Sequence, residues 1–278
     1  MLPVPPLSKC RLCGAHGKLI VSHLIPDFFI RSLQREVPTG KLGQTQPSSI
    51  MLSLSPEEEG GQRQRGYWEK RSGIIESMLC ADCEGRFSRY ENYFRTFFYG
   101  KNPAPLKKTL VGTSVDLSTF TGLDPDILGV TAAKLNYEWF KLFVLSLVWR
   151  ASVAKGNFFK KISLGPRHEA NLATILKTEN PGPDDQYAIF MIDLQHAKYG
   201  LEDFVQQPDC VRDGAQRGCS FIIGGFMLVI FIAAAGHRPP DPVGSFCLRA
   251  SGELLLVSCR ANHIVRWWAT RLKDAGKI

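Results

Sequence analysis

Four cysteines in two pairs constrain this chain more than any other feature. Cys10 and Cys13 form one Cys-x-x-Cys pair, and Cys80 and Cys83 form the other. Two intervening residues allow a tight turn to present both sulfurs of a pair to one ion, and two such turns complete the four-thiolate tetrahedron of a structural zinc site. The alternative is four unrelated buried thiols. We expect one structural zinc ion bound by all four cysteines.

The 66 residues between the two pairs are too many for a simple zinc ribbon, so a further element must lie between them. With 278 residues, the chain is long enough for one large domain or two small ones. Residues 1–110 carry 16 Lys and Arg against 10 Asp and Glu, whereas the remainder carries 18 against 16. The positive excess around the cysteine pairs is what a phosphate-backbone partner requires. A merely basic, solvated surface is the alternative.

The cysteines and the N-terminus together indicate the compartment. The N-terminus has no cationic start followed by an apolar stretch, so it does not resemble a secretory signal. We therefore expect a cytoplasmic protein whose remaining cysteines are free core thiols. These cysteines are Cys210, Cys219, Cys247 and Cys259.

One uncharged stretch, Gly218–Gly236, is 19 residues long and could on length alone span a bilayer. Gly224 and Gly225 interrupt it, and it is rich in Phe, Ile and Val. This composition favours two buried strands over a membrane helix.

The remaining elements follow from periodicity and turn residues. Three-to-four spacing of aromatic residues predicts a helix over 84–99, and a longer apolar pattern predicts a core helix over 132–154. Shorter helices are expected over 27–35, 168–177 and 261–274, a loop or arm over 37–66, and a linker over 100–126. Strands are expected around 18–26 and 67–79, and over 187–194, 221–223, 226–233, 243–249 and 253–259, with a hairpin turn at Ser251-Gly252.

A histidine motif lies between the cysteine pairs. Ser22-His23-Leu24-Ile25-Pro26 stands at the predicted end of a strand, and Cys80-Ala81-Asp82-Cys83-Glu84 enters the predicted helix. Over residues 8–98 the chain resembles the zinc-knuckle type of HNH, or ββα-metal, endonucleases. The resemblance implies an α+β protein with a zinc-knuckle ββα-metal nuclease module over 1–110. A mixed α/β domain of unknown role, with a central apolar helix and antiparallel strands, then follows over 111–278.

The resemblance also implies roles for individual residues. His23 matches the family's general base, and a histidine suits this task because its ordinary pKa lies near neutrality. Glu84 stands where the family has a metal-binding His or Asn. Glu91 lies two turns further along the same helix face, while Asn92 is a weaker candidate ligand. Carboxylate oxygens suit a catalytic magnesium or manganese ion better than zinc.

Arg86 and Arg89 are the expected contacts to backbone phosphates. The chain also departs from the family pattern, because Ser22 replaces the usual Asp or His metal ligand and no clear middle Asn precedes Cys80. His23 has the alternative of being a buried, hydrogen-bonded histidine. Glu84 and Glu91 have the alternative of lying on a solvated helix face.

Together these features predict a metal-dependent endonuclease that hydrolyses phosphodiester bonds in DNA or RNA, with DNA the favoured substrate. A regulatory protein partner is a further expectation, and no membrane association is expected. The alternative is a zinc-stabilised module that binds nucleic acid or protein without catalysis.

Overall fold

The computed structural model describes residues 8–32, 74–101, 106–109, 112–121, 124–156, 159, 162–195, 205–206, 208–213 and 216–262. It also describes the backbone of three strands, over 34–38, 45–52 and 67–69. Of residues 32, 210–213 and 216, only the backbone is described. The predicted helix over 261–274 lies almost wholly outside these ranges, and so do Glu57, Glu58, Glu59 and Arg63 of the predicted arm.

The cysteine pairs lie on two small hairpins and one helix. Strands β1 (Ser8–Lys9) and β2 (His16–Gly17) flank the first pair and form an antiparallel hairpin. Strand β3 (Ile20–His23) pairs antiparallel with β7 (Ile75–Leu79), and helix α2 (Ala81–Tyr99) follows β7 after a single residue. Helix α1 (Asp27–Ser32) begins four residues after the end of β3. The predicted strand around 18–26 and the predicted helix over 84–99 are confirmed. Of the predicted strand around 67–79, residues 75–79 form β7 and residues 67–69 belong to another sheet.

Helix α2 forms because its apolar residues recur at helical spacing. Phe87, Tyr90, Phe94 and Phe98 are all buried on one side of the helix. Gly100 ends the helix with a φ of 78°, a conformation that favours glycine, and its N–H bonds to the carbonyl of Thr96.

Part of the predicted loop over 37–66 is strand instead. Strands β4 (Gln34–Pro38), β5 (Thr45–Leu52) and β6 (Tyr67–Glu69) form a separate antiparallel sheet in the order β4-β5-β6. The Pro, Ser and Gln content of this segment lowers its strand propensity. Pairing with neighbouring strands overrides that preference here.

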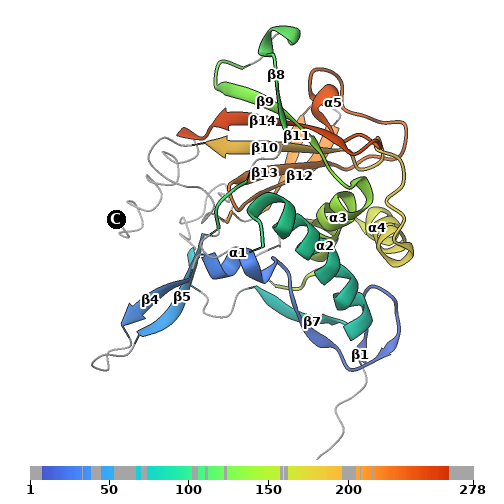
Figure 1. The fold of residues 1–278 in the computed structure, drawn as a ribbon. Coiled ribbons are helices and arrows are strands. Elements are labelled where there is room, and N and C mark those ends of the chain that lie inside the picture. Colours follow the sequence, from blue (N-terminus) through green and yellow to red (C-terminus); the bar gives the residue numbers. More distant parts are fainter. Residues whose placement is uncertain are drawn as a thin grey trace, which may run out of the picture.

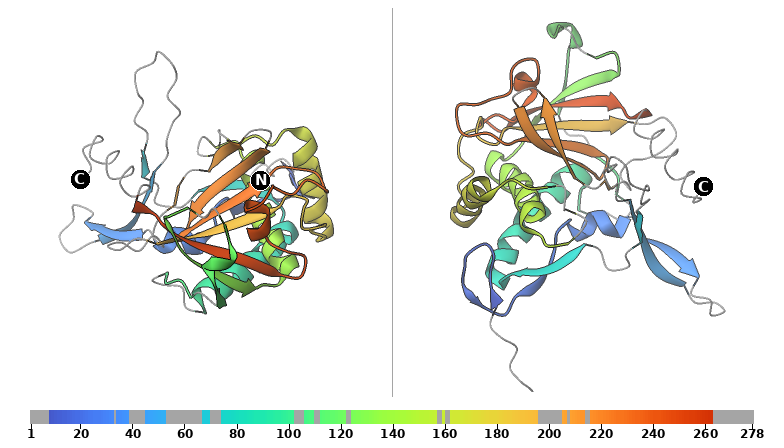
Figure 2. Two further views of the ribbon diagram at one scale, coloured as in Figure 1. Left: turned by 90° about the horizontal axis from the view of Figure 1, so that it is seen from above. Right: turned by 180° about the vertical axis from the view of Figure 1, so that it is seen from behind.

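Seven strands form the main sheet, in the order β11-β12-β13-β10-β14-β9-β8. Neighbouring strands run antiparallel except β10 and β14, which are parallel. The strands are β8 (Thr113–Val115), β9 (Ile127–Lys134), β10 (Ile189–Gln195), β11 (Asp209–Asp213), β12 (Gln216–Ile223), β13 (Phe226–Phe231) and β14 (Glu253–Arg260). Figures 1 and 2 show α2 and α3 between this sheet and the hairpins that carry the cysteines.

Other predicted elements are also wrong in part. Residues 132–134 belong to β9 and not to the start of the long helix, which is α3 (Tyr137–Val153). The helix starts there because the Asn136 side chain accepts a hydrogen bond of 3.0 Å from the Trp139 N–H. The predicted strand over 243–249 begins instead as a short helix, α5 (Val243–Phe246). A side chain at Gly244 would lie 2.2 Å from the carbonyl oxygen of Pro239, so this close approach requires glycine.

The uncharged stretch Gly218–Gly236 contains two buried strands, as predicted. Strands β12 and β13 pair antiparallel, and Gly224 and Gly225 form the turn between them with φ values of 57° and 83°. Among the residues described, no helix has both the length and the apolar character needed to cross a bilayer.

One hydrophobic core extends over both predicted segments of the chain. Helix α3 packs against α2, against α4 (Pro166–Thr178) and against β13. Phe94 of α2 stacks on Phe143 of α3 with ring centroids 4.3 Å apart, and Phe98 contacts Phe226 of β13 at 5.1 Å. The predicted division at residue 110 stays a prediction, and in the described residues the two segments share this core.

Candidate metal centre and strand–helix site

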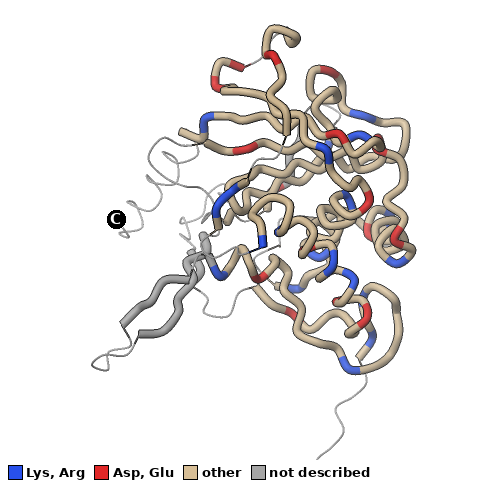
Figure 3. Tube along the Cα trace, in the orientation of Figure 1, with Lys and Arg blue, Asp and Glu red and all other residues tan. Residues whose placement is uncertain are grey.

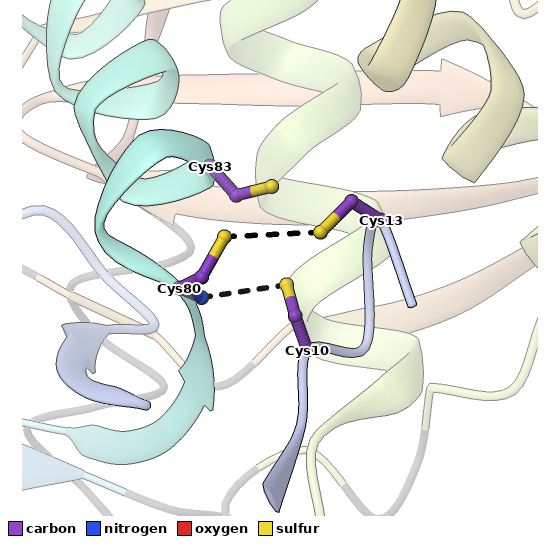
Figure 4. A group of neighbouring side chains, drawn as sticks. All are labelled: Cys10, Cys13, Cys80 and Cys83. Atoms are coloured by element: carbon purple, nitrogen blue, oxygen red, sulfur yellow. Dashed lines mark hydrogen bonds between the residues drawn. The ribbon is translucent and has the colours of Figure 1, made fainter. Parts of the chain in front are cut away.

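The four cysteines lie together at the junction of the first hairpin and the start of α2 (Figure 4). Their Sγ atoms are all within 4.8 Å of one another, and those of Cys13 and Cys80 are 3.7 Å apart. Four thiolates at about 2.3 Å from a zinc ion are about 3.8 Å from each other, whereas a disulfide joins its sulfurs at about 2.05 Å. The spacing therefore fits a shared ion, and the cluster suggests a structural metal such as zinc.

Local backbone geometry sets up each pair. In the first turn, the Gly14 N–H bonds to the Cys10 carbonyl at 2.9 Å, and Gly14 has a φ of 80° that favours glycine. The second pair opens α2, where Cys80 precedes the helix and Cys83 lies in its first turn. The Cys80 N–H points at the Cys10 sulfur across a distance of 3.3 Å. Backbone N–H groups at a helix N-terminus favour negative charge, so this is a suitable place for thiolates.

The thiols of Cys10 and Cys83 have shifted pKa values. Burial raises the pKa of Cys10, but backbone N–H groups from both pairs outweigh it and lower that pKa to about 7. Burial, with the neighbouring sulfurs, raises the pKa of the Cys83 thiol. Several adjacent thiolates repel one another, so the cluster needs a cation to hold them all deprotonated.

Arg11 connects the first cysteine pair to the rest of the molecule. Its guanidinium lies 2.5 Å from a carboxylate oxygen of Glu76 on β7 and donates a 2.6 Å hydrogen bond to the carbonyl of Val153. Glu76 also accepts a hydrogen bond from the backbone N–H of Lys155. The cysteine cluster, the β3–β7 strand pair and the end of α3 are therefore joined.

His23 is the last residue of β3, at the point where the chain turns into α1. Its side chain is 35% exposed, and its Nε2 atom lies 3.5 Å from an oxygen of Asp27, which is also paired with Arg31. The backbone carbonyl of His23 accepts a 2.5 Å hydrogen bond from Arg150 of α3. His23 is accessible to solvent and is held from two sides.

Glu84 and Glu91 lie two turns apart on α2. A buried oxygen of each, Glu84 Oε2 and Glu91 Oε1, has no hydrogen-bond partner within the described part of the chain, and the same holds for Ser22 Oγ. Glu91 Oε1 lies 2.7 Å from Arg150 Nη2, so an ion pair compensates its charge. Glu84 Oε2 and Ser22 Oγ are then the buried oxygens that a cation could contact.

The pKa of Glu91 shows that these groups share one neighbourhood. Burial raises it, Arg150 opposes that rise, and the charges of Glu84 and His23 also act on it. His23, Glu84 and Glu91 are therefore near enough for their charges to interact. They are not as compact as the thiol cluster. Across the described ranges, only the four cysteines form a group of three or more candidate ligands with all ligand atoms within 4.8 Å.

Arg86, Arg89 and Asn92 make other contacts. Arg86 donates to the carbonyl of Lys177 at 2.8 Å, and Arg89 pairs at 2.8 Å with Glu179, both at the end of α4. Asn92 is exposed and accepts a hydrogen bond from Arg95. Basic and acidic residues are interspersed around α2 and α4 (Figure 3). The predicted phosphate contacts of Arg86 and Arg89 stay a prediction.

Sequence reasoning missed two residues of this neighbourhood, Asp27 and Arg150. Asp27 follows His23 by four residues, and the helix that begins there was predicted, so the pairing had a local signal. Arg150 is a buried charge near the end of an apolar helix, and a buried charge needs a partner. The sequence does not indicate which partner that is.

Comparison with protein-family models found no matching family, and searches of curated proteins and of solved structures found no match either.

Proposed function

We propose that this protein is a metal-dependent endonuclease of the HNH type, which hydrolyses phosphodiester bonds in DNA or RNA. One observation carries the proposal. A solvent-accessible histidine ends a strand beside a helix whose Glu84 has a buried oxygen with no hydrogen-bond partner in the described residues. The arrangement of elements supports it, since β3 pairs with β7, α2 follows β7 after one residue, and the cysteine cluster lies beside both.

In this proposal, His23 is the general base that accepts a proton from the attacking water. Asp27, 3.5 Å from Nε2, stabilises the imidazolium that results. Glu84, with Glu91 as a second candidate, would provide oxygen ligands for a magnesium or manganese ion, which would neutralise charge that develops on the phosphate. Ser22 is a departure from the family pattern, and its buried hydroxyl would be a weaker ligand than a carboxylate or an imidazole.

The net positive charge of residues 1–110 favours a nucleic-acid substrate, and we propose DNA ahead of RNA. Arg89 is the better placed of the two predicted phosphate contacts, because its side chain is 56% exposed even while paired with Glu179. The segment over 111–278 would recognise substrate or a regulatory protein partner.

A second candidate function is a zinc-stabilised module that binds nucleic acid or protein without catalysis. The pairing of Glu91 with Arg150 favours it, because a guanidinium beside a carboxylate reduces the attraction of that carboxylate for a metal ion. The two functions differ in their response to a chelator that removes magnesium and manganese but leaves the zinc. Cleavage would stop, whereas metal-independent binding would continue.

The test is the substitution His23→Ala, with His16→Ala as matched control. Loss of a general base is expected to slow magnesium- or manganese-dependent cleavage about a hundredfold to ten-thousandfold. Nucleic-acid binding and zinc content should be unchanged, because neither depends on the imidazole. His16 is exposed on β2 in the same part of the molecule, so His16→Ala should cleave like the parent protein. A His23→Ala protein that cleaves at the parental rate would exclude His23 as the base.

A further inference from the structure

Glu84 and Glu91 form a natural pair for comparison. They are the same residue type, on the same helix and on the same face, seven residues apart. Their surroundings differ. Glu91 lies 2.7 Å from the guanidinium of Arg150, and its side chain is 17% exposed. Glu84 is partly buried, and no salt bridge to it occurs among the described residues.

Arg150 is held from several directions. Its side chain is fully buried. Nη1 donates to the His23 carbonyl at 2.5 Å, and Nε and Nη2 approach the carbonyl and hydroxyl of Ser146 at 3.3 Å each. The guanidinium also lies 5.2 Å from the ring centre of Phe87. A side chain with this many fixed contacts stays in place when a ligand binds nearby.

His23 on β3 and the two glutamates on α2 form the strand–helix site. We propose that Arg150 is the permanent counter-ion of Glu91 in this site, so that Glu84 and not Glu91 carries the charge that attracts a divalent ion. Glu91 and Arg150 then form a positioning pair. It joins α2 to α3 and holds the carbonyl of His23, and therefore the end of β3, at a fixed place. This inference rests on the proposed function. It ranks Glu84 above Glu91 as a metal ligand, and it adds Arg150 of α3 to the site.

Charge explains the ranking. A buried carboxylate must be neutralised by protonation or by a nearby cation, and Arg150 supplies that cation for Glu91 at ion-pair distance. A divalent ion that bound Glu91 as well would be close to the fixed guanidinium and would be repelled by it. Glu84 has no such partner among the described residues, so its charge is available.

Manganese binding to the zinc-loaded, full-length protein tests the ranking, followed by electron paramagnetic resonance. Manganese is the probe because thiolates prefer zinc and leave it to oxygen ligands. Glu84→Gln should weaken binding at least about tenfold. The double variant Glu91→Gln with Arg150→Met removes the pair without leaving an unpaired guanidinium, and it should change binding less than about threefold. Glu138→Gln, an exposed carboxylate on α3, is the control and should bind like the parent. Equal losses for Glu84→Gln and for the double variant would overturn the ranking.

Thermal unfolding tests the positioning pair without any divalent ion. Removing one partner of a buried ion pair is strongly destabilising, so Arg150→Met should lower the melting temperature by about 10 °C. The double variant Glu91→Gln with Arg150→Met removes both charges, and it should melt higher than the sum of the two single effects predicts. Additive effects would show that Glu91 and Arg150 are not coupled and would overturn the pair.

The results separate failure of this inference from failure of the proposed function. If the parent protein binds manganese and cleaves nucleic acid, but the two glutamates behave alike, only the inference is wrong. If the parent protein neither binds manganese nor cleaves, both are wrong, even where Glu91 and Arg150 are coupled in stability. Arg150→Lys gives a further readout in a folded protein. Lysine keeps the positive charge but lacks the several fixed N–H donors of the guanidinium. A positioning role therefore predicts a lower kcat with little change in KM.

Discussion

At the scale of single residues, the cysteines and the glutamates satisfy their charge in different ways. The four sulfurs have one another and the backbone N–H groups of the two turns, and they suit an ion that all of them share. Glu91 has a fixed internal cation, and Glu84 has a buried oxygen without a partner in the described residues. The shared ion affects folding, because the unfolded chain has no preformed site for it.

Cys80→Ser tests the thiol cluster. A structural zinc contributes its binding free energy to folding, so losing one of four thiolates should lower the free energy of unfolding by several kcal/mol and leave the protein without stoichiometric zinc. Elemental analysis and thermal unfolding measure the two effects. Cys259→Ser changes a thiol outside the cluster and should retain one zinc per chain. A stable Cys80→Ser protein with no loss of zinc would contradict the four-cysteine site.

At the scale of elements, α3 is unusual because it is buried on all sides yet contains two basic residues. It is buried from Phe140 to Ala151, as expected of a helix enclosed by other elements. Lys141 donates to the Tyr137 hydroxyl at 3.0 Å and to the Pro183 carbonyl at 2.5 Å near its start, and Arg150 pairs with Glu91 near its end. The two charges attach the helix to the loop before β10 and to α2.

Stability should depend on pH through Lys141. Burial lowers the pKa of Lys141 from 10.5 to about 8, although the carboxylates of Asp184 and Asp185 oppose the shift and Arg238 adds to it. Between pH 8 and 10.5 the unfolded chain keeps a proton that the folded chain has released, so this group makes the folded state more stable as pH rises. The effect is at most about 3 kcal/mol over that window.

Lys141→Met serves as the reference protein for this measurement. Denaturant unfolding at a series of pH values should show the parent gaining stability relative to Lys141→Met from pH 8 to 10.5. Groups that titrate in both proteins cancel in the difference. A difference that does not change with pH would mean that the pKa of Lys141 is the same in the folded and unfolded states.

At the scale of the whole molecule, the strand–helix site and the seven-stranded sheet share one core. Phe94 of α2 stacks on Phe143, and Phe87 contacts Trp149 at 6.2 Å. Arg11 and Arg150 add polar contacts between the same parts. If residues 1–110 were an independent module, α2 would expose its aromatic face to water.

We therefore predict that a fragment of residues 1–110 does not fold cooperatively when produced alone, even with zinc. Its exposed aromatic face should bind a hydrophobic dye and cause aggregation, and adding residues 111–278 should restore a native-like spectrum. Circular dichroism and dye fluorescence measure both effects. A monomeric fragment with a sharp thermal transition would instead support two separable domains divided at residue 110.

Much of the candidate site followed from short stretches of sequence. The pairing of the cysteines, the helix after Cys80 and the strand that ends at His23 all depend on residues close together in the chain. Spacing and periodicity within such stretches constrain local structure directly. The two strands on either side of Gly224-Gly225 were predictable for the same reason.

Tertiary structure alone decided the rest. The ion pair of Glu91 with Arg150 joins residues 59 positions apart, and the contacts of Arg86 and Arg89 with α4 span about 90 positions. The end of strand β9, residues 132–134, was taken for helix because pairing with β14 and β8, and not its own residues, makes it a strand. The sequence by itself determined which side chains can hold a metal, because ligand chemistry belongs to the residue. Whether the charge of such a side chain is available to a metal ion depends on the groups that folding places beside it, because the energy of a buried charge is set by its surroundings.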